Sequence, residues 1–483
     1  MSYEQALQAL RDGDLKTAIP LLARAVEETA YANEELNHAY TLALYRAGEK
    51  ARLGYAALEM GDAALEARPA LALDYFQRAF LGGLDAACLR YIGEIFEGWA
   101  PSRVDGVDGV AGVDGVAGPT TPSAPIKKVA HVVGSVRGDH LPAQHVVAVV
   151  ESLRQLGVES QVFTTEWSSS WFFNTNGVHA DSELLLADAV IASTDGNFIE
   201  RAERVAAAIR AWGAEAVFYH AGFNEQITAR VAAFRPGPIQ INVAHGVQMD
   251  ADFFDGFIHL TKQGIAASHH STQPREWIPA LSDIVERVRA CPPNMRHLMG
   301  LGNAETVSAT LGDLQQVSDP AYLYVLTGIL KVFPNHFHLF AGSGDVKTIR
   351  AALHAEGVLP RVRFLGTMSE VASVMAATDV YLCPFNKSDE SVLLEAMATG
   401  RPCIAVGFPD DSARNSAAEV LGIPELTADS EVAYLAIAQG VLRDAENRAQ
   451  YSELVRARFE SEFSRASLGR KYVEFLSKLQ QVG

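Results

Sequence analysis

From Lys127 onward, short apolar runs alternate with longer amphipathic segments, and this alternation restricts the fold more than any other feature of the chain. The runs KKVAHVV and AEAVFYH are rich in β-branched and aromatic residues, as buried strands are. The segment AQHVVAVVESLRQLG, which follows the first run, has the apolar period of a helix. Further runs such as DVYLCPF repeat the pattern later in the chain. The alternation predicts an α/β protein with two facing, doubly wound parallel sheets, whose ligands bind beyond the carboxyl ends of the strands.

The sequence before Lys127 divides into a helical segment and a linker. The segments 13–28 and 72–98 each pair a Gly-bearing turn with helices, and the second resembles a Sel1-type or tetratricopeptide repeat. Such repeats present a concave surface to a partner, although a helical cap that only stabilises the rest is the alternative. Residues 101–125 are dense in Gly and Pro, as flexible linkers are. The expected domains are a helical-repeat domain (1–99), a flexible linker (100–126) and two Rossmann-like domains (127–290 and 291–483).

Composition excludes several classes of function. The chain has 483 residues and a net charge of −18, which argues against a general nucleic-acid binder or a protein that adheres to anionic membranes. Its four cysteines are widely spaced without a CxxC pair, as reduced thiols in a cytoplasmic protein are. The N-terminus has no secretory signal, and no apolar run reaches membrane-spanning length. We therefore expect a cytoplasmic protein with no nucleic-acid partner and no membrane span, whose oligomeric state stays open.

The stretch SDESVLLEAMATGRPCIAV, residues 388–406, is the most informative about function. It predicts a helix opened by polar residues, a Gly stop and a buried strand. The N–H groups at a helix start bind anions, and Glu395 lies one turn further in, where it could hold a sugar hydroxyl. In a second motif, Gly342-Ser343-Gly344 follows a strand and lets the main chain approach a ligand without Cβ hindrance. Together the two motifs suit a nucleotide-diphosphate sugar.

The motifs AGSGD, VLPRVRFLGTMSEVASVMAATDVYLCPF and LLEAMATGRPCIA resemble the donor half of GT-B glycosyltransferases that carry an EAMA motif. The resemblance is best over 340–407 and extends in general layout over 127–483. It implies that two Rossmann-like domains clamp the sugar nucleotide, with 127–290 on the acceptor side and 291–483 on the donor side. It also implies that Glu395 holds the ribose hydroxyls of the donor. The other residues that it implies near the donor are Gly342, Gly344, Gly366, Thr367, Ser388, Asp389, Glu390 and Ser391.

The acidic pattern departs from that of the commonest retaining enzymes of this kind. Those enzymes carry two Glu residues with seven residues between them, which would place the first at Lys387. Glu390 precedes Glu395 by only five residues, about 140° around a helix, so the two would not share a face. Asp389 or Glu390 could substitute from the preceding loop. Retention or inversion of the anomeric centre therefore stays open.

Residues 237–258, beginning GPIQINVAHG, and residues 311–340, which contain the dipeptide DP, resemble the protein O-GlcNAc transferase family and its bacterial relatives. In that family a Lys before the DP helix neutralises the departing diphosphate. The aligned position here is Gln316, which has no charge. The resemblance therefore implies that the helix start at 388–391, or a basic residue such as Lys387, stabilises the leaving phosphate without a metal ion.

Three residues are candidates for the acid–base chemistry. His245 ends the strand IQINVA in a Gly loop, where it could act as a base or a sugar ligand. His220 ends the strand AVFYH in the same way, and Asp250 could be the base of an inverting reaction. A structural role is the alternative for each histidine. No metal-ligating spacing is evident in the sequence, so we expect neither a bound metal nor a resident cofactor.

These resemblances imply a glycosyltransferase of hexosyl or N-acetylhexosaminyl type, with a UDP-sugar as the donor most frequent in such families. The expected acceptor is a protein recruited by the helical repeats. One alternative is transfer to a polysaccharide or a glycolipid. Another is a scaffold without catalytic activity, in which helical repeats accompany a degenerate transferase domain.

Overall fold

A computed structural model of the chain describes most of its residues. The described residues are 3–64, 72, 75–76, 78–79, 124–136, 141–165, 184–191, 198–222, 225–245, 248–249, 251–262, 272–280, 284–302, 304–344, 346–366, 371–386, 390–408 and 416–482. The chain forms two compact units. The first comprises Met1–Leu260, Gly264–Trp277 and Val473–Gly483, and the second comprises Thr261–Gln263 and Ile278–Tyr472.

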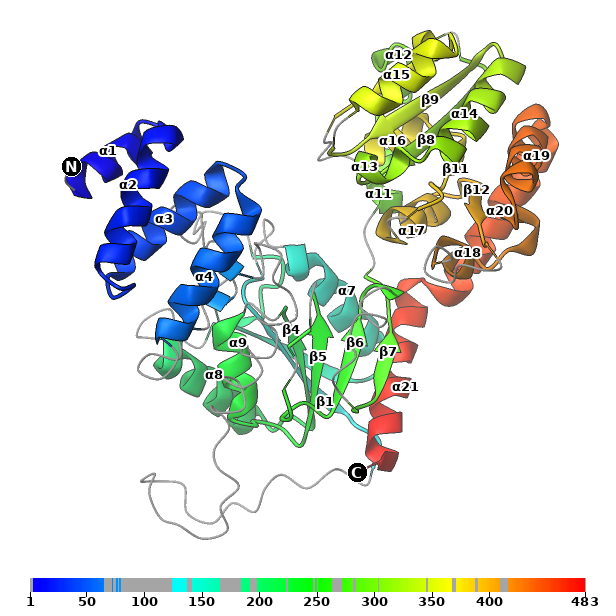
Figure 1. Ribbon diagram of the computed structural model, residues 1–483. Coiled ribbons are helices and arrows are strands. Elements are labelled where there is room, and N and C mark those ends of the chain that lie inside the picture. The colour runs from blue at the N-terminus through cyan, green and yellow to red at the C-terminus, as the bar shows by residue number, and fades with distance from the viewer. Residues whose placement is uncertain are drawn as a thin grey trace. The chain divides into compact units, whose positions relative to one another are not determined.

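The first unit begins with helices that pack one against the next along the chain (Figure 1). They are α1 (Tyr3–Arg11), α2 (Leu15–Glu28), α3 (Glu34–Arg46) and α4 (Lys50–Ala64). The side chains of Asp14 and Asn33 cap α2 and α3, because each accepts a hydrogen bond from a backbone N–H of the first turn. An all-helical N-terminal region is thus confirmed over α1–α4. The repeat expected at 72–98 lies outside the described residues, apart from a few single positions.

The first sheet has seven parallel strands in the order β3-β2-β1-β4-β5-β6-β7. The strands are β1 (Lys128–Val133), β2 (Glu159–Thr164), β3 (Val190–Ile191), β4 (Ala216–His220), β5 (Ile239–Ala244), β6 (Gly256–His259) and β7 (Arg275–Trp277). The main helices between them are α7 (Leu141–Gln155), α8 (Phe198–Trp212) and α9 (Gln226–Ala233). The strand order reverses between β1 and β4, which is the switch point where doubly wound sheets bind ligands.

The end of the chain packs against β6 and β7 of the first unit (Figure 1). The last helix is α21 (Arg465–Val482), and its residues from Val473 onward belong to this unit. A Cβ at Gly256 would lie 2.9 Å from Cζ of Phe475 and 3.1 Å from the methyls of Leu479. Lys478 forms an ion pair with Glu276 of β7. Glycine at position 256 therefore lets the helix approach the sheet closely.

The second unit contains six parallel strands in the order β10-β9-β8-β11-β12-β13. The strands are β8 (Thr306–Leu311), β9 (His336–Ala341), β10 (Val362–Phe364), β11 (Val380–Leu382), β12 (Cys403–Val406) and β13 (Thr427–Ala428). Its helices are α11 (Ile284–Ala290), α12 (Met295–Leu298), α13 (Leu314–Val317), α14 (Pro320–Val332), α15 (Lys347–Ala355), α16 (Val371–Ala377), α17 (Glu390–Ala398), α18 (Ser416–Leu421), α19 (Glu431–Arg443) and α20 (Ala445–Glu462). Here the strand order reverses between β8 and β11.

The two doubly wound α/β domains predicted from the sequence are confirmed, since each unit holds a parallel sheet with one reversal of strand order. The exact domain boundaries stay predictions. None of the helices in the described ranges is long and apolar enough to cross a membrane.

Candidate functional site

Three glycines at the carboxyl edge of the second sheet bring the main chain of neighbouring strands close together. The N–H of Gly342, which follows β9, donates to the carbonyl of Gly366, 2.8 Å away after β10. A Cβ at Gly342 would lie 1.7 Å from the carbonyl oxygen of Gly312, and its φ of +148° is one that other residues rarely adopt. Gly344 also has a positive φ, of +122°. The predicted donor residues Gly342, Gly344 and Gly366 therefore lie together at the end of neighbouring strands.

The loop after β11 is held in place by the core of the second unit. Thr310 of β8 donates its hydroxyl to the carbonyl of Leu382 at 2.8 Å, and Tyr434 of α19 donates to the carbonyl of Cys383 at 3.0 Å. The ring of Phe385 packs edge-on against that of Tyr434, with centroids 5.0 Å apart. These contacts fix the chain from Leu382 to Phe385, directly after β11. Since β11 borders the reversal of strand order, the N-terminus of α17 lies at the switch point of the second sheet.

The helix that was predicted from SDESVLLEAMATG is α17, and it begins at Glu390. Glu390 is only 4% exposed, and its Oε2 accepts the backbone N–H of Lys262 at 2.8 Å. Ser391 is exposed and Glu395 is half-buried. Gly400, with a φ of +69°, follows the helix and leads into the buried strand β12. The predicted order of helix, Gly stop and strand is confirmed.

Some of the predicted site residues cannot be placed. Thr367, Ser388, Asp389 and Asp250 lie outside the described residues, as does Lys387. Gln316 belongs to α13, but its side chain is not among those described. The dipeptide after it does begin a helix, because Asp319 caps α14 by accepting from the N–H of Ala321 at 2.8 Å. The roles expected for these residues stay predictions.

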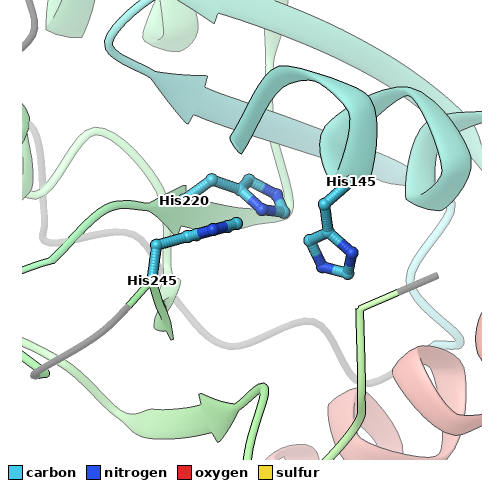
Figure 2. A group of neighbouring side chains, drawn as sticks. All are labelled: His145, His220 and His245. Carbon is cyan, nitrogen blue, oxygen red and sulfur yellow. The ribbon is translucent and has the colours of Figure 1, made fainter. Parts of the chain in front are cut away.

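In the first unit, histidines from separate elements gather at the carboxyl edge of the sheet (Figure 2). His220 is the last residue of β4, His245 follows β5 directly, and His145 comes from α7. One ring nitrogen from each of the three lies within 4.8 Å of the other two. His131 of β1 joins them, with its Nδ1 at 3.0 Å from Nε2 of His220 in a hydrogen bond. The cluster borders the reversal between β1 and β4, so it occupies the switch point of the first sheet.

Burial keeps most of this histidine cluster neutral. Burial lowers the pKa of His131 to about 3 and that of His145 to about 4. It also lowers the pKa of His220 well below its ordinary value, because desolvation disfavours the charged ring. These rings therefore keep a nitrogen lone pair at neutral pH. His245 is the least buried member of the cluster.

The polar residues of β5 position the histidines. Asn242 donates to the carbonyls of Tyr219 and Ala221, at 3.2 and 3.0 Å, and its Oδ1 accepts the N–H of Met249 at 3.0 Å. It thereby ties the end of β4, which carries His220, to the segment that follows His245. Gln240, the Gln of the PIQ sequence, is buried and donates to the carbonyls of Ala232, in α9, and Phe253, in the segment after β5. Both amides are buried, and these hydrogen bonds satisfy their polar atoms, as buried polar groups require.

The sequence singled out His220 and His245 but not His131 or His145. Both of the missed residues stand among valines and alanines in an apolar strand and an amphipathic helix, where a single histidine is usually structural. Strand register brings His131 beside β4, opposite Phe218, and no local spacing shows this.

Of the cysteines that the structure describes, Cys383 and Cys403 are buried and Cys291 is half-buried, and all three are free thiols.

Two doubly wound parallel sheets in one chain, each with a candidate site at its switch point, are the arrangement of the GT-B class of fold, which the comparisons below support. Residues 321–437, which run from α14 into α19, match the family model of glycosyl transferases group 1. This match supports a glycosyltransferase, and it includes Gly342, Gly366 and the whole of α17. None of the curated protein sequences matches the chain significantly.

Solved structures with a similar fold come from several transferases. The O-GlcNAc transferase of Thermobaculum terrenum, in a mutant form, is 17% identical, with a TM-score of 0.53 over 99% of this chain and 97% of that chain. Anabaena HepE in complex with UDP and glucose is 14% identical, with a TM-score of 0.48 over 73% of this chain and 100% of that one. Sucrose-phosphate synthase of Thermosynechococcus elongatus is 15% identical, with a TM-score of 0.46 over 74% and 100%. At these identities the likeness concerns the fold alone.

Proposed function

We propose that this protein transfers a sugar from a nucleoside-diphosphate donor, with UDP as the favoured nucleotide, to a protein acceptor. One observation carries the proposal. Helix α17 begins at the switch point of the second sheet, inside the segment that matches glycosyl transferases group 1. A helix start of this kind points backbone N–H groups and the positive end of the helix dipole toward a diphosphate.

The nucleotide sugar is proposed to bind at the same carboxyl edge of the second sheet. A Cβ at Gly366 would meet nothing within 4 Å, so a nucleotide can lie against the main chain there, and the absence of a side chain at Gly342 lets the neighbouring strand end pack close by. Glu395 lies one turn into α17 and is half-buried, a position from which a carboxylate can accept hydrogen bonds from the ribose hydroxyls. The N–H groups of α17 stabilise the charge that develops on the leaving phosphate, so the proposed reaction needs no metal ion. Thr367, Ser388 and Asp389 are proposed to complete this donor site.

The acceptor chemistry is proposed for the histidine cluster of the first unit. His245 is its least buried member and serves as the base that takes the acceptor proton. His220 is almost fully buried and hydrogen-bonded to His131, so it acts as a residue that positions the cluster rather than as the base. Asp250 is the alternative base, and the stereochemical outcome of the transfer stays open with it. We further propose that the helices before residue 100 recruit the acceptor and that the protein works in the cytoplasm.

Binding of a panel of nucleotide sugars, followed by thermal unfolding, tests the donor half of this proposal. A ligand that binds the folded state at 100 times its Kd adds about 2.7 kcal/mol to the free energy of unfolding. We expect UDP-sugars to raise the Tm of the full chain. The Glu395→Ala variant should lose this shift, whereas Glu474→Ala, which removes an exposed carboxylate from α21, should keep it. A Tm unchanged by every UDP-, GDP- and ADP-sugar would contradict the proposal.

A further inference from the structure

The histidine cluster of the first unit has the composition of a transition-metal site. His145, His220 and His245 supply three imidazoles from three different elements (Figure 2). Zinc is bound by His nitrogens at about 2.0–2.1 Å, and a tetrahedral site places two such nitrogens about 3.4 Å apart. The ring nitrogens here lie within 4.8 Å of one another, so small rotations of the side chains are enough to close around an ion. Three protein nitrogens leave the fourth position to water.

The surroundings of His220 favour a metal ligand. Its Nε2 is engaged with His131, while its Nδ1 has no hydrogen-bond partner among the described residues and lies in a side chain only 1% exposed. When Nε2 carries the proton and donates it to His131, the lone pair of Nδ1 is free to bind an ion. Histidines that bind metals are oriented in this way by a partner on the other ring nitrogen. His131 is therefore placed as the residue that fixes the ring of His220.

The protonation state of the rings is also suitable. A metal ion binds only neutral imidazole, and it competes with the proton for the same nitrogen. The rings of His145 and His220 are buried, which disfavours the charged imidazolium form. Three imidazoles without a thiolate suit zinc and its neighbours in the first transition series.

We infer that His145, His220 and His245 form a binding site for one divalent transition-metal ion, with Zn²⁺ as the expected ion and His131 as the orienting partner. This inference concerns metal binding alone and does not rest on the proposed transfer reaction. Inhibition of transfer by zinc is a further consequence, and it does rest on His245 being the base of that reaction. A zinc ion at this site occupies the lone pair that His245 needs as a base, so zinc would inhibit transfer reversibly.

Zinc binding to the full chain, after treatment with a chelator, tests the inference directly. The probe is Zn²⁺ alone, titrated in competition with a chromophoric indicator at pH 7.5. We expect one equivalent of zinc per chain. The variants His145→Ala and His220→Ala should bind at least about 100-fold more weakly, and His131→Phe about 10–100-fold more weakly, as is typical when an orienting partner is lost. His354→Ala, which removes an exposed histidine from α15, should bind as the parent chain does.

A second readout guards against variants that fail to fold. Co²⁺ in a tetrahedral site of nitrogen ligands gives a visible absorption that an ion bound loosely at the surface does not give. We expect this absorption in the parent chain and in His354→Ala, and its loss in His245→Ala, which removes the least buried of the three rings. Equal zinc affinity and an unchanged cobalt spectrum in His220→Ala and His245→Ala would overturn the inference. Zinc that binds at the site without inhibiting transfer would instead contradict the role of His245 as base.

Discussion

The backbone N–H of Lys262 donates to Oε2 of Glu390 at 2.8 Å, a hydrogen bond between residues 128 positions apart. Lys262 also pairs through its ammonium group with Glu419 of α18. The segment around Lys262 is thereby held against the start of α17 within the second unit. The carboxylate of Glu390 thus has a contact within the second unit, and Glu395 is the residue proposed to bind the donor.

The two glutamates of α17 should therefore respond differently to substitution. Glu390→Ala removes the acceptor of a buried hydrogen bond, so we expect it to lower the free energy of unfolding by about 1–3 kcal/mol. Glu390→Gln keeps an oxygen acceptor, so it should lower the free energy of unfolding by less than Glu390→Ala does. Glu395→Ala should abolish nucleotide-sugar binding, whereas Glu390→Gln should keep it. Urea unfolding measures the stability of the two Glu390 variants and calorimetric titration measures nucleotide-sugar binding, and parental stability of Glu390→Ala would contradict the contact with Lys262.

Substitution of Gly342 should disrupt the donor edge of the second sheet. An added Cβ would overlap the carbonyl oxygen of Gly312, and the backbone conformation of Gly342 is strained for any other residue. We expect Gly342→Ala to lower stability by more than about 2 kcal/mol and to weaken donor binding. Gly440→Ala is the matched control, because space is open around this helical glycine and alanine is favoured there by about 1 kcal/mol. Similar unfolding curves for the two variants would show that the Gly312 carbonyl does not lie close to Gly342.

Loss of His245 should slow the transfer step without loss of donor binding. A positioned general base contributes about 10²–10⁴ to a rate. We therefore expect His245→Ala to lower kcat at least about 100-fold while the Kd for the nucleotide sugar stays the same. His354→Ala, on the exposed face of α15, should keep the parental rate. A parental rate in His245→Ala would assign the base to another residue, for which Asp250 is the candidate.

Buried histidines in the second sheet should make the protein sensitive to acid. His336 and His338 flank Ser308, whose hydroxyl lies 2.8 and 2.7 Å from their ring nitrogens. Burial lowers the pKa of His336 to about 3 and that of His338 well below its ordinary value.

Both rings ionise near pH 6.5 in the unfolded chain, so the unfolded state binds more protons between pH 6.5 and 3. Stability is therefore full above pH 6.5 and falls as the pH drops below it, by up to about 2.7 kcal/mol per pH unit for the two rings together. Urea unfolding at pH 7.5, 6.5 and 5.5 measures this, and His336→Gln should reduce the slope. A stability that is constant from pH 7.5 to 5.5 would refute the prediction.

The sequence was sufficient to predict those parts of the fold that depend on local chemistry. The strand and helix periods after Lys127 predicted both doubly wound sheets, and a polar start followed by Gly400 and Pro402 predicted α17 and β12. Such signals act over a few residues, so they are visible without a structure. Gly342 and Gly366 were expected near the donor only from the resemblance to GT-B enzymes, and the structure places them together at the ends of neighbouring strands.

The missed features depend on register and on distant segments. The contact of Glu390 with Lys262 could not be predicted from the sequence, because the two residues are 128 positions apart and only the folded second unit brings them together. His131 and His145 look like ordinary members of apolar segments, and only the pairing of β1 with β4 brings His131 beside His220. The sequence therefore predicted the two histidines at strand ends but not the cluster to which they belong.

Turnover of a labelled UDP-sugar by the purified full chain, with an acceptor protein present, is the direct test of sugar transfer. We expect release of UDP and covalent labelling of the acceptor, both reduced at least about 100-fold in Glu395→Ala and in His245→Ala. Both activities should persist when EDTA is present, because the helix start at α17 and not a metal ion is proposed to stabilise the leaving phosphate. Tight binding of the donor with neither hydrolysis nor transfer would contradict the account and would favour a scaffold that has lost its catalytic activity.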